Sequence, residues 1–255
     1  CVLFTFILFC FYKIGGDDLP AAPFSNSISF NEKTDFIRSK DLSQIEYLSV
    51  GSSMTLNNID SETIVKYLGQ NYLNAGSWGF KISNSREFIS KMIEFFPKLK
   101  AVIISGSFVD FTTGTWSAEV DYDLVRRSLK YDMNILNYYL TLDIKYLFEN
   151  SKKNKSIKSV KNAYNSLAFD EYGGRILEIE PDKINHERWN NDISGFAVDE
   201  SELESLKDLL IFLKKRNIRV VFAFPPQRQG MINDENILTI NKKIKLIQSV
   251  VEENQ

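Results

Sequence analysis

The chain holds few of the residues on which metal sites and disulfide frameworks depend. Its 255 residues include one histidine and two cysteines. Cys1 and Cys10 form no CxxC pair, so neither a disulfide framework nor a cysteine-based zinc site is expected. A single histidine excludes a histidine-rich metal site. The sequence therefore predicts no metal ion and no other cofactor.

The chain also has no large excess of charge of one sign. Lys plus Arg number 31 and Asp plus Glu number 33, which gives a formal net charge of -2. Nucleic-acid binding usually needs a concentrated basic surface, and the one local basic run, residues 152–161, is typical of a solvated loop or helix face. We therefore expect no nucleic-acid partner.

An apolar run opens the chain. Residues 1–12 are apolar except for Thr5, and Lys13, Ile14 and the polar sequence GGDD follow them. The run is shorter than the roughly 20 residues that span a bilayer. Because the chain starts with Cys rather than Met, we interpret residues 1–14 as the remnant of a membrane anchor or uncleaved signal segment, with a buried core helix as the alternative. The anchor predicts a domain outside the cytoplasm, in the periplasm or at the cell surface.

Strands and helices alternate after a Gly-, Pro-, Ser- and Asn-rich stretch that predicts a linker over residues 15–40. Apolar runs predict strands at 45–50, 71–75, 101–106 and 218–226. Amphipathic periodicity and capping residues predict helices at 60–69, 83–97, 199–217 and 233–255. This alternation predicts one α/β domain over residues 41–255, with three α/β/α layers and a mostly parallel, flavodoxin-like sheet. The pattern breaks at about residues 111–195, where we expect a partly helical insertion over one edge of the sheet.

Three successive predicted strands end in glycine, serine or asparagine. The blocks are GSS at 51–53, NAGSWG at 74–79 and GSFVD at 106–110. Ligands bind at the carboxyl ends of the strands in such sheets. Each block alone is typical of a turn, whereas three in succession indicate a site. The first loop lacks the GxGxxG or GxxxxGK[ST] pattern that cradles phosphates, which argues against a nucleotide-binding domain.

These blocks resemble those of the SGNH/GDSL hydrolase superfamily, most closely its envelope-associated branch of acyl esterases and O-acyltransferases. The resemblance implies that Ser53 is the nucleophile and that the N–H groups of Ser53 and Gly79 form the oxyanion hole. The third block matches at Gly106, but Phe108 stands where the family has its oxyanion asparagine. Ser107 is the alternative donor.

The fourth block of the family, Asp-x-x-His, supplies the general base and is not found. The only histidine, His186, follows Asp182 at a different spacing and precedes a strand–helix unit instead of following the last strand. We expect the block to lie beyond Gln255, and we expect the 255-residue chain to hydrolyse esters little or not at all.

The resemblance implies a membrane-anchored, extracytoplasmic serine esterase or O-acyltransferase acting on acyl groups of a cell-envelope polysaccharide. The alternative is a non-catalytic relative that binds a glycan or assembles with a membrane-bound acyltransferase, which Phe108 favours. Arg228, after a predicted strand, is a possible contact for an anionic substrate. Trp116 and Trp189 could stack on sugar rings, although packing against the insertion is the commoner role of such residues.

Overall fold

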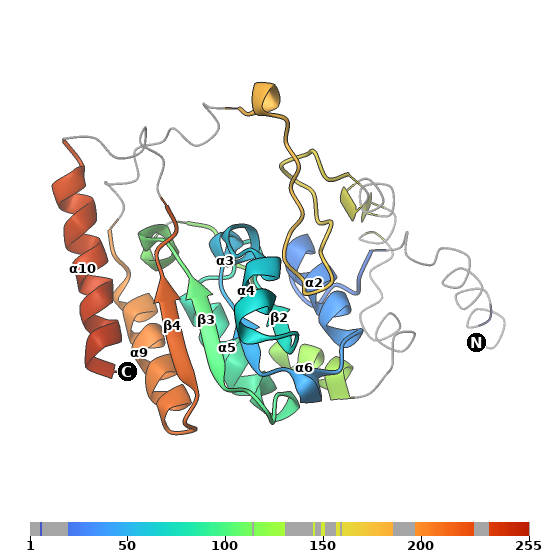
Figure 1. The fold of residues 1–255 in the computed structure, drawn as a ribbon, viewed down its shortest axis with the longest axis horizontal. Coiled ribbons are helices and arrows are strands. Elements are labelled where there is room, and N and C mark those ends of the chain that lie inside the picture. Colours follow the sequence, from blue (N-terminus) through green and yellow to red (C-terminus); the bar gives the residue numbers. More distant parts are fainter. Residues whose placement is uncertain are drawn as a thin grey trace.

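A parallel four-stranded sheet forms the centre of the protein. The computed structural model describes residues 20–113, 115–130, 160–185, 197–226 and 235–254, with Phe6, Lys145, 149–150 and 157–158. The strands are β1 (Tyr47–Ser49), β2 (Tyr72–Asn74), β3 (Ala101–Ser105) and β4 (Arg219–Ala223), in the order β2-β1-β3-β4. All three pairings are parallel. The carboxyl ends of the strands therefore share one edge of the sheet, the upper edge in Figure 1.

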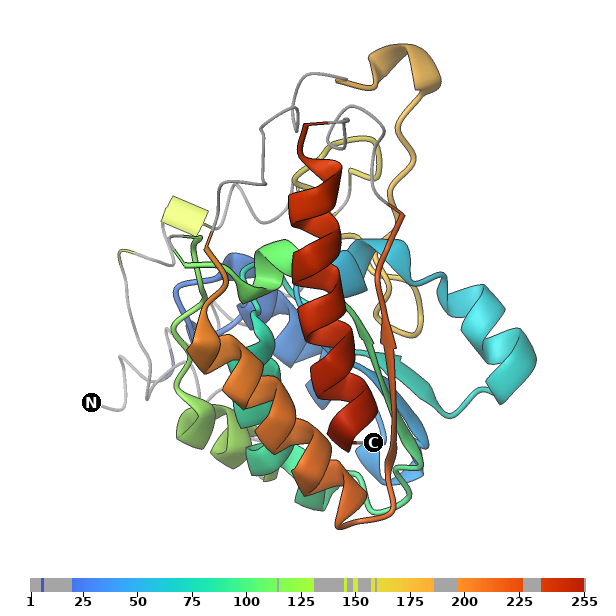
Figure 2. The ribbon, with the colours of Figure 1, turned by 90° about the vertical axis from the view of Figure 1, so that its left-hand side faces the viewer.

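Helices cover both faces of this sheet, so the expected three-layer α/β/α fold is confirmed. The helices are α2 (Ile28–Arg38), α3 (Ser53–Asn58), α4 (Ser61–Leu68), α5 (Ile82–Met92), α6 (Tyr122–Lys130), α9 (Glu200–Lys214) and α10 (Ile237–Asn254). Figure 2 shows α9 and α10 on one face and α4 on the other. Short 3₁₀ turns lie at η2 (Leu42–Gln44), η3 (Ile93–Phe95), η4 (Phe108–Phe111) and η5 (Pro181–Lys183).

Most of the helices and strands that periodicity and capping residues predict are present in the structure. Asp60 accepts the Thr63 N–H at 3.2 Å and starts α4, and Asp199 accepts the Ser201 N–H at 3.0 Å and starts α9. In β3, Val102 and Ile104 are fully buried, as expected for a central strand covered by helices. The strands are shorter than the apolar runs that predict them.

The predicted linker over residues 15–40 is wrong for its described part. Residues 28–38 form α2, whose Phe30 and Ile37 belong to the main hydrophobic core. The polar residues that indicate a linker instead make local hydrogen bonds. Ser27 caps the helix by accepting the Phe30 N–H, and the Asn31 side chain bonds Ser25 at 2.8–3.0 Å. These bonds satisfy the polar groups of a segment that packs as core.

Residues 160–185, part of the expected insertion, lie beside β2, the edge strand of the sheet (Figure 1). The Asn74 N–H donates to the Tyr172 carbonyl at 2.7 Å, and the Arg175 N–H donates to the Leu56 carbonyl at 3.2 Å. This placement agrees with an insertion over one sheet edge. The predicted anchor at residues 1–14 lies outside the described residues except for Phe6. Among the helices of the described part, none has the length and apolar character needed to cross a membrane.

We predict that α2 contributes strongly to stability. The Phe30 ring is 1% exposed and stacks on Phe80 with 5.1 Å between ring centroids, so Phe30→Ala should leave a cavity. The free energy of unfolding should fall by about 3–5 kcal/mol, measured by urea denaturation. Asp35→Ala, on the exposed side of the same helix, is the matched control and should change it by less than about 0.5 kcal/mol. Equally small effects for both variants would favour the linker.

Candidate functional site

The Thr55 side chain ties the loop after β1 to the end of β3. Its hydroxyl lies 3.0 Å from the Val50 carbonyl oxygen and 2.8 Å from that of Ser105, and it accepts the Ser105 N–H at 3.1 Å. Gly51 has a φ of 141°, and a Cβ at this position would overlap the Thr55 hydroxyl. A residue with a side chain is therefore strained here. β1 also lies between β2 and β3, so the turn sits where the strand order reverses, the usual ligand position in such sheets.

The two serines of this turn have different environments. Ser52 is buried, and its hydroxyl oxygen accepts the Met54 N–H at 3.1 Å as the N-cap of α3. Ser53 is the first residue of α3 and is partly exposed. Within the described part of the chain, the Ser53 side chain makes no hydrogen bond. Ser52 is therefore a capping residue, and Ser53 is the serine of the pair that keeps some exposure to solvent.

The second loop packs directly against α3. The buried Asn74 side chain donates to the Thr55 carbonyl at 3.2 Å and accepts the Gly76 N–H at 2.9 Å, so it braces both segments. A Cβ at Gly76 would lie 2.7 Å from the Leu56 nitrogen. The Ser77 N–H donates to the Gly51 carbonyl at 3.0 Å. The first two motif loops, which the sequence predicts to be neighbours, are in direct contact.

Gly79, the predicted oxyanion-hole glycine, lies beneath a tryptophan. Its φ is 69°, and a Cβ there would overlap the indole of Trp116. Its carbonyl accepts the Ala118 N–H at 2.8 Å. Among the described residues, the Gly79 N–H has no hydrogen-bond partner. A ligand that accepts from this N–H would therefore displace no hydrogen bond of the described residues, which is a requirement for an oxyanion donor.

The polar groups of the third loop form hydrogen bonds with one another. The Ser107 N–H donates to Asp110 Oδ2 at 2.8 Å, and the Ser107 hydroxyl oxygen accepts the Val109 N–H at 3.3 Å, which forms a capping box for η4. Ser107 is buried, so this arrangement does not favour it as a donor to a ligand. Phe108 is 1% exposed and packs in the hydrophobic core.

Asp110, the last residue of the third motif block, is a buried carboxyl group to which the sequence assigns no catalytic role. Burial raises its pKa to about 6, although interactions with the Ser52 side chain and the Ser107 N–H oppose that rise. Of the nearby charges, Glu202 raises the pKa further and Lys81 lowers it. The Ser-x-x-Asp spacing of the capping box is the sequence signal that could have identified Asp110 as part of this turn.

Three of the residues proposed from the sequence lie outside the described residues: His186, Trp189 and Arg228. The structure therefore does not bring them to the site or separate them from it. Among the described residues, no group of histidine, cysteine, aspartate and glutamate side chains could hold a metal ion.

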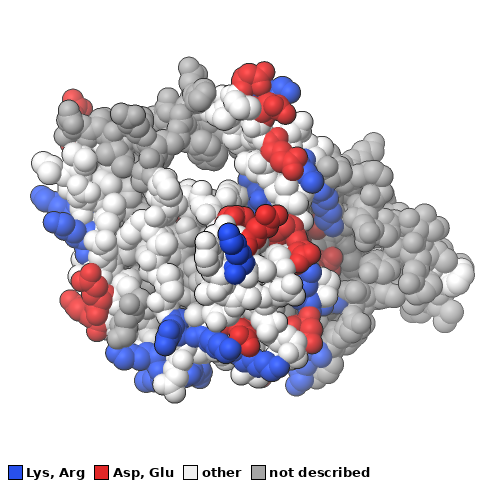
Figure 3. All heavy atoms as spheres, viewed as in Figure 1, with Lys and Arg blue, Asp and Glu red and all other residues white. Residues whose placement is uncertain are grey.

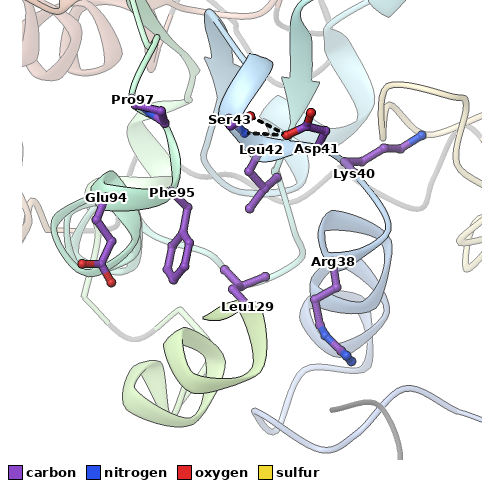
Figure 4. A pocket seen from close by; sticks show the side chains of 9 residues that line it. All are labelled: Arg38, Lys40, Asp41, Leu42, Ser43, Glu94, Phe95, Pro97 and Leu129. Atoms are coloured by element: carbon purple, nitrogen blue, oxygen red, sulfur yellow. Dashed lines mark hydrogen bonds between the residues drawn. The ribbon is translucent and has the colours of Figure 1, made fainter. Parts of the chain in front are cut away.

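A pocket of about 340 Å³ lies at the opposite edge of the sheet (Figure 4). It is lined by residues that precede β1 and β3 and by the ends of α2 and α6: Arg38, Lys40, Asp41, Leu42, Ser43, Glu94, Phe95, Pro97 and Leu129. Lys and Arg side chains also gather along the lower rim of the face in Figure 3, at the amino ends of the strands. This pocket shares no residue with the three motif loops, so it is not part of the candidate site.

Comparison of the chain with models of known protein families, with curated proteins and with solved structures found no match. The resemblance to the SGNH/GDSL superfamily therefore rests on the three short sequence motifs alone.

We predict a pH-dependent contribution of Asp110 to stability. Because its pKa is raised above the ordinary value of 3.8, the native state binds this proton more tightly than the unfolded chain. The stabilising contribution is complete below about pH 4 and is lost as the pH rises through 6. Relative to Asp110→Asn, the wild-type free energy of unfolding should fall by up to about 3 kcal/mol between pH 4 and pH 7.

Urea denaturation of both proteins across this range measures the difference. The asparagine can still accept the Ser107 N–H, so the capping box is kept in the control. A difference that stays constant with pH, or that grows as pH rises, would contradict the raised pKa.

Proposed function

We propose that this protein is a serine esterase or O-acyltransferase that acts on acyl groups of a cell-envelope polysaccharide, with Ser53 as the nucleophile. The observation that carries the proposal is the division of roles in the GSS turn. The Ser52 hydroxyl accepts the Met54 N–H as the cap of α3, whereas Ser53 is partly exposed at the carboxyl edge of the sheet. A partly exposed serine in a turn that hydrogen bonds fix to two strands is suited to nucleophilic attack.

The proposed reaction uses the loops around this turn. The Ser53 oxygen attacks the acyl carbonyl, and the N–H groups of Ser53 and Gly79 stabilise the oxyanion. Neither N–H has a hydrogen-bond partner among the described residues. The proton lost by the Ser53 hydroxyl is transferred to the sugar oxygen, which leaves as a hydroxyl group, and an acyl ester on Ser53 remains. Attack by water on this ester completes a hydrolysis, and attack by another sugar hydroxyl completes a transfer.

Asp110 is not assigned as the base that takes the Ser53 proton. The serine that interacts with its carboxyl group is Ser52, and the carboxyl also accepts the Ser107 N–H. We assign Asp110 to holding the turn.

The remaining parts of the proposal rest on the sequence. The polysaccharide substrate is implied by the resemblance to the envelope-associated branch. The apolar run at residues 1–12 supports attachment to a membrane and a place in the periplasm or at the cell surface.

One observation favours a second function, in which the protein binds a glycan or assembles with a membrane-bound acyltransferase without catalysing a reaction. Phe108 occupies the position of the family's oxyanion asparagine, and its ring is committed to the core. An oxyanion hole here would have two N–H donors and no side-chain amide. Loss of one such donor costs about 10²–10³ in kcat in a serine protease.

Labelling with a fluorophosphonate probe tests the proposal. The full-length wild-type protein should be labelled, and Ser53→Ala should lose the label. Ser52→Ala is the matched control: it removes the cap and lowers stability by about 1 kcal/mol, but it should keep the label.

Circular dichroism checks that both variants fold. A label that persists in Ser53→Ala would show that another residue reacts. An unlabelled wild-type protein would favour the non-catalytic function.

A further inference from the structure

The Trp116 indole is exposed in spite of its size. It is 55% exposed, and its six-membered ring lies over Gly79, where a Cβ would overlap it. Large aromatic side chains usually bury most of their surface. An indole that covers the predicted oxyanion-hole glycine while exposing more than half its area therefore needs an explanation.

The backbone on both sides of Trp116 is fixed. The Ala118 N–H donates to the Gly79 carbonyl at 2.8 Å, and the Ala118 carbonyl accepts from the Asn84 side chain at 2.9 Å. The Ser117 hydroxyl donates to Asn84 Oδ1 at 2.9 Å, and the Thr115 hydroxyl donates to the Thr112 carbonyl at 3.3 Å. The ring is thus presented by an anchored loop, which lowers the entropy lost when a ligand stacks on it.

A series of contacts between neighbouring side chains, which includes a second indole, connects Gly79 with the helix that carries Ser53. Trp78 precedes Gly79, and the Arg175 guanidinium carbon lies 5.7 Å from the centroid of its ring. Arg175 also donates to Asn57 Oδ1 at 3.2 Å. Asn57 is exposed and lies four residues after Ser53 in α3, hence on the same side of the helix. Ser53, Asn57, Arg175, Trp78 and Trp116 are therefore linked by successive neighbours.

We propose that Trp116, with Trp78, Arg175 and Asn57, forms a subsite that binds a sugar ring of the substrate beside Ser53. This inference rests on the proposed function for its position in the reaction, and it adds the residues that recognise the glycan. A sugar ring has an apolar face of C–H groups and a rim of hydroxyl groups. The indole matches the face and the Asn57 amide matches the rim, while the Arg175 guanidinium, which donates to Asn57 and to the Ala163 and Tyr164 carbonyls, holds that amide in place.

The surroundings favour a sugar over a lipid acyl chain. An acyl chain would bury its length against contiguous apolar surface. The residues that link Trp116 to Ser53 instead include Arg175 and the exposed Asn57, whose polar groups an acyl chain would desolvate without compensation.

Isothermal titration calorimetry with the Ser53→Ala protein tests this subsite without any turnover. The probes are the trisaccharides of N-acetylglucosamine, xylose and galacturonate, with sodium decanoate as the acyl-chain probe. We expect at least one trisaccharide to bind. Adding Trp116→Ala should weaken that binding about tenfold, and Trp116→Phe should weaken it less.

Tyr67→Ala, which removes another exposed aromatic ring (74% exposed) from α4, is the matched control and should leave binding unchanged. The inference is overturned if no trisaccharide binds, if decanoate alone binds, or if Trp116→Ala binds like its parent. Because titration and fluorophosphonate labelling are independent, the two proposals fail separately. Trp116-dependent binding without labelling leaves a glycan-binding protein, and labelling without binding leaves an esterase for another substrate.

Discussion

The hydroxyl group of Thr55 holds the ends of two parallel strands in one place, and the candidate site depends on it. It lies within hydrogen-bonding distance of the Val50 and Ser105 carbonyl oxygens and accepts the Ser105 N–H. Its position requires glycine at residue 51, which sets the direction of the turn. The Asn74 side chain then bonds the Thr55 carbonyl and brings the second loop against α3. Ser53 is thereby fixed relative to strands on both sides of β1.

A second buried polar contact joins α2 to the end of β2 and to the segment around Gly173. The Lys33 ammonium group donates to the Asn74 carbonyl at 3.1 Å and to the Gly173 carbonyl. Burial lowers the pKa of Lys33 to about 7, and the nearby Asp170 opposes this shift. The ammonium also lies 3.8 Å from the centroid of the Phe169 ring, a favourable contact for a cation. This lysine joins α2 to the segment that carries Arg175, so the helix mistaken for a linker helps to position the proposed sugar subsite.

The secondary structure could be read from the sequence wherever a local signal determines it. Caps such as Asp60 and Asp199 mark real helix starts, and the apolar runs mark real strands. Local signals failed for α2, because its buried polar side chains find their partners outside the helix: Asn31 bonds Ser25, and the Ser29 hydroxyl bonds the Ser77 hydroxyl. For the site, the sequence could predict that the motif loops are neighbours, because the carboxyl ends of parallel strands lie at one edge of the sheet. The different roles of Ser52 and Ser53, the burial of Asp110 and the placement of Trp116 over Gly79 depend on contacts between distant segments, which no local pattern encodes.

The central claim is that Ser53 forms a covalent acyl intermediate. The most direct measurement is rapid acid quenching of the full-length protein after mixing with p-nitrophenyl acetate, followed by mass-spectrometric mapping of its peptides. The account predicts one acetyl group, carried by Ser53 and lost as turnover proceeds. An acetyl group on Ser52 or on any other residue, or no acetylated peptide in spite of ester hydrolysis, would contradict it.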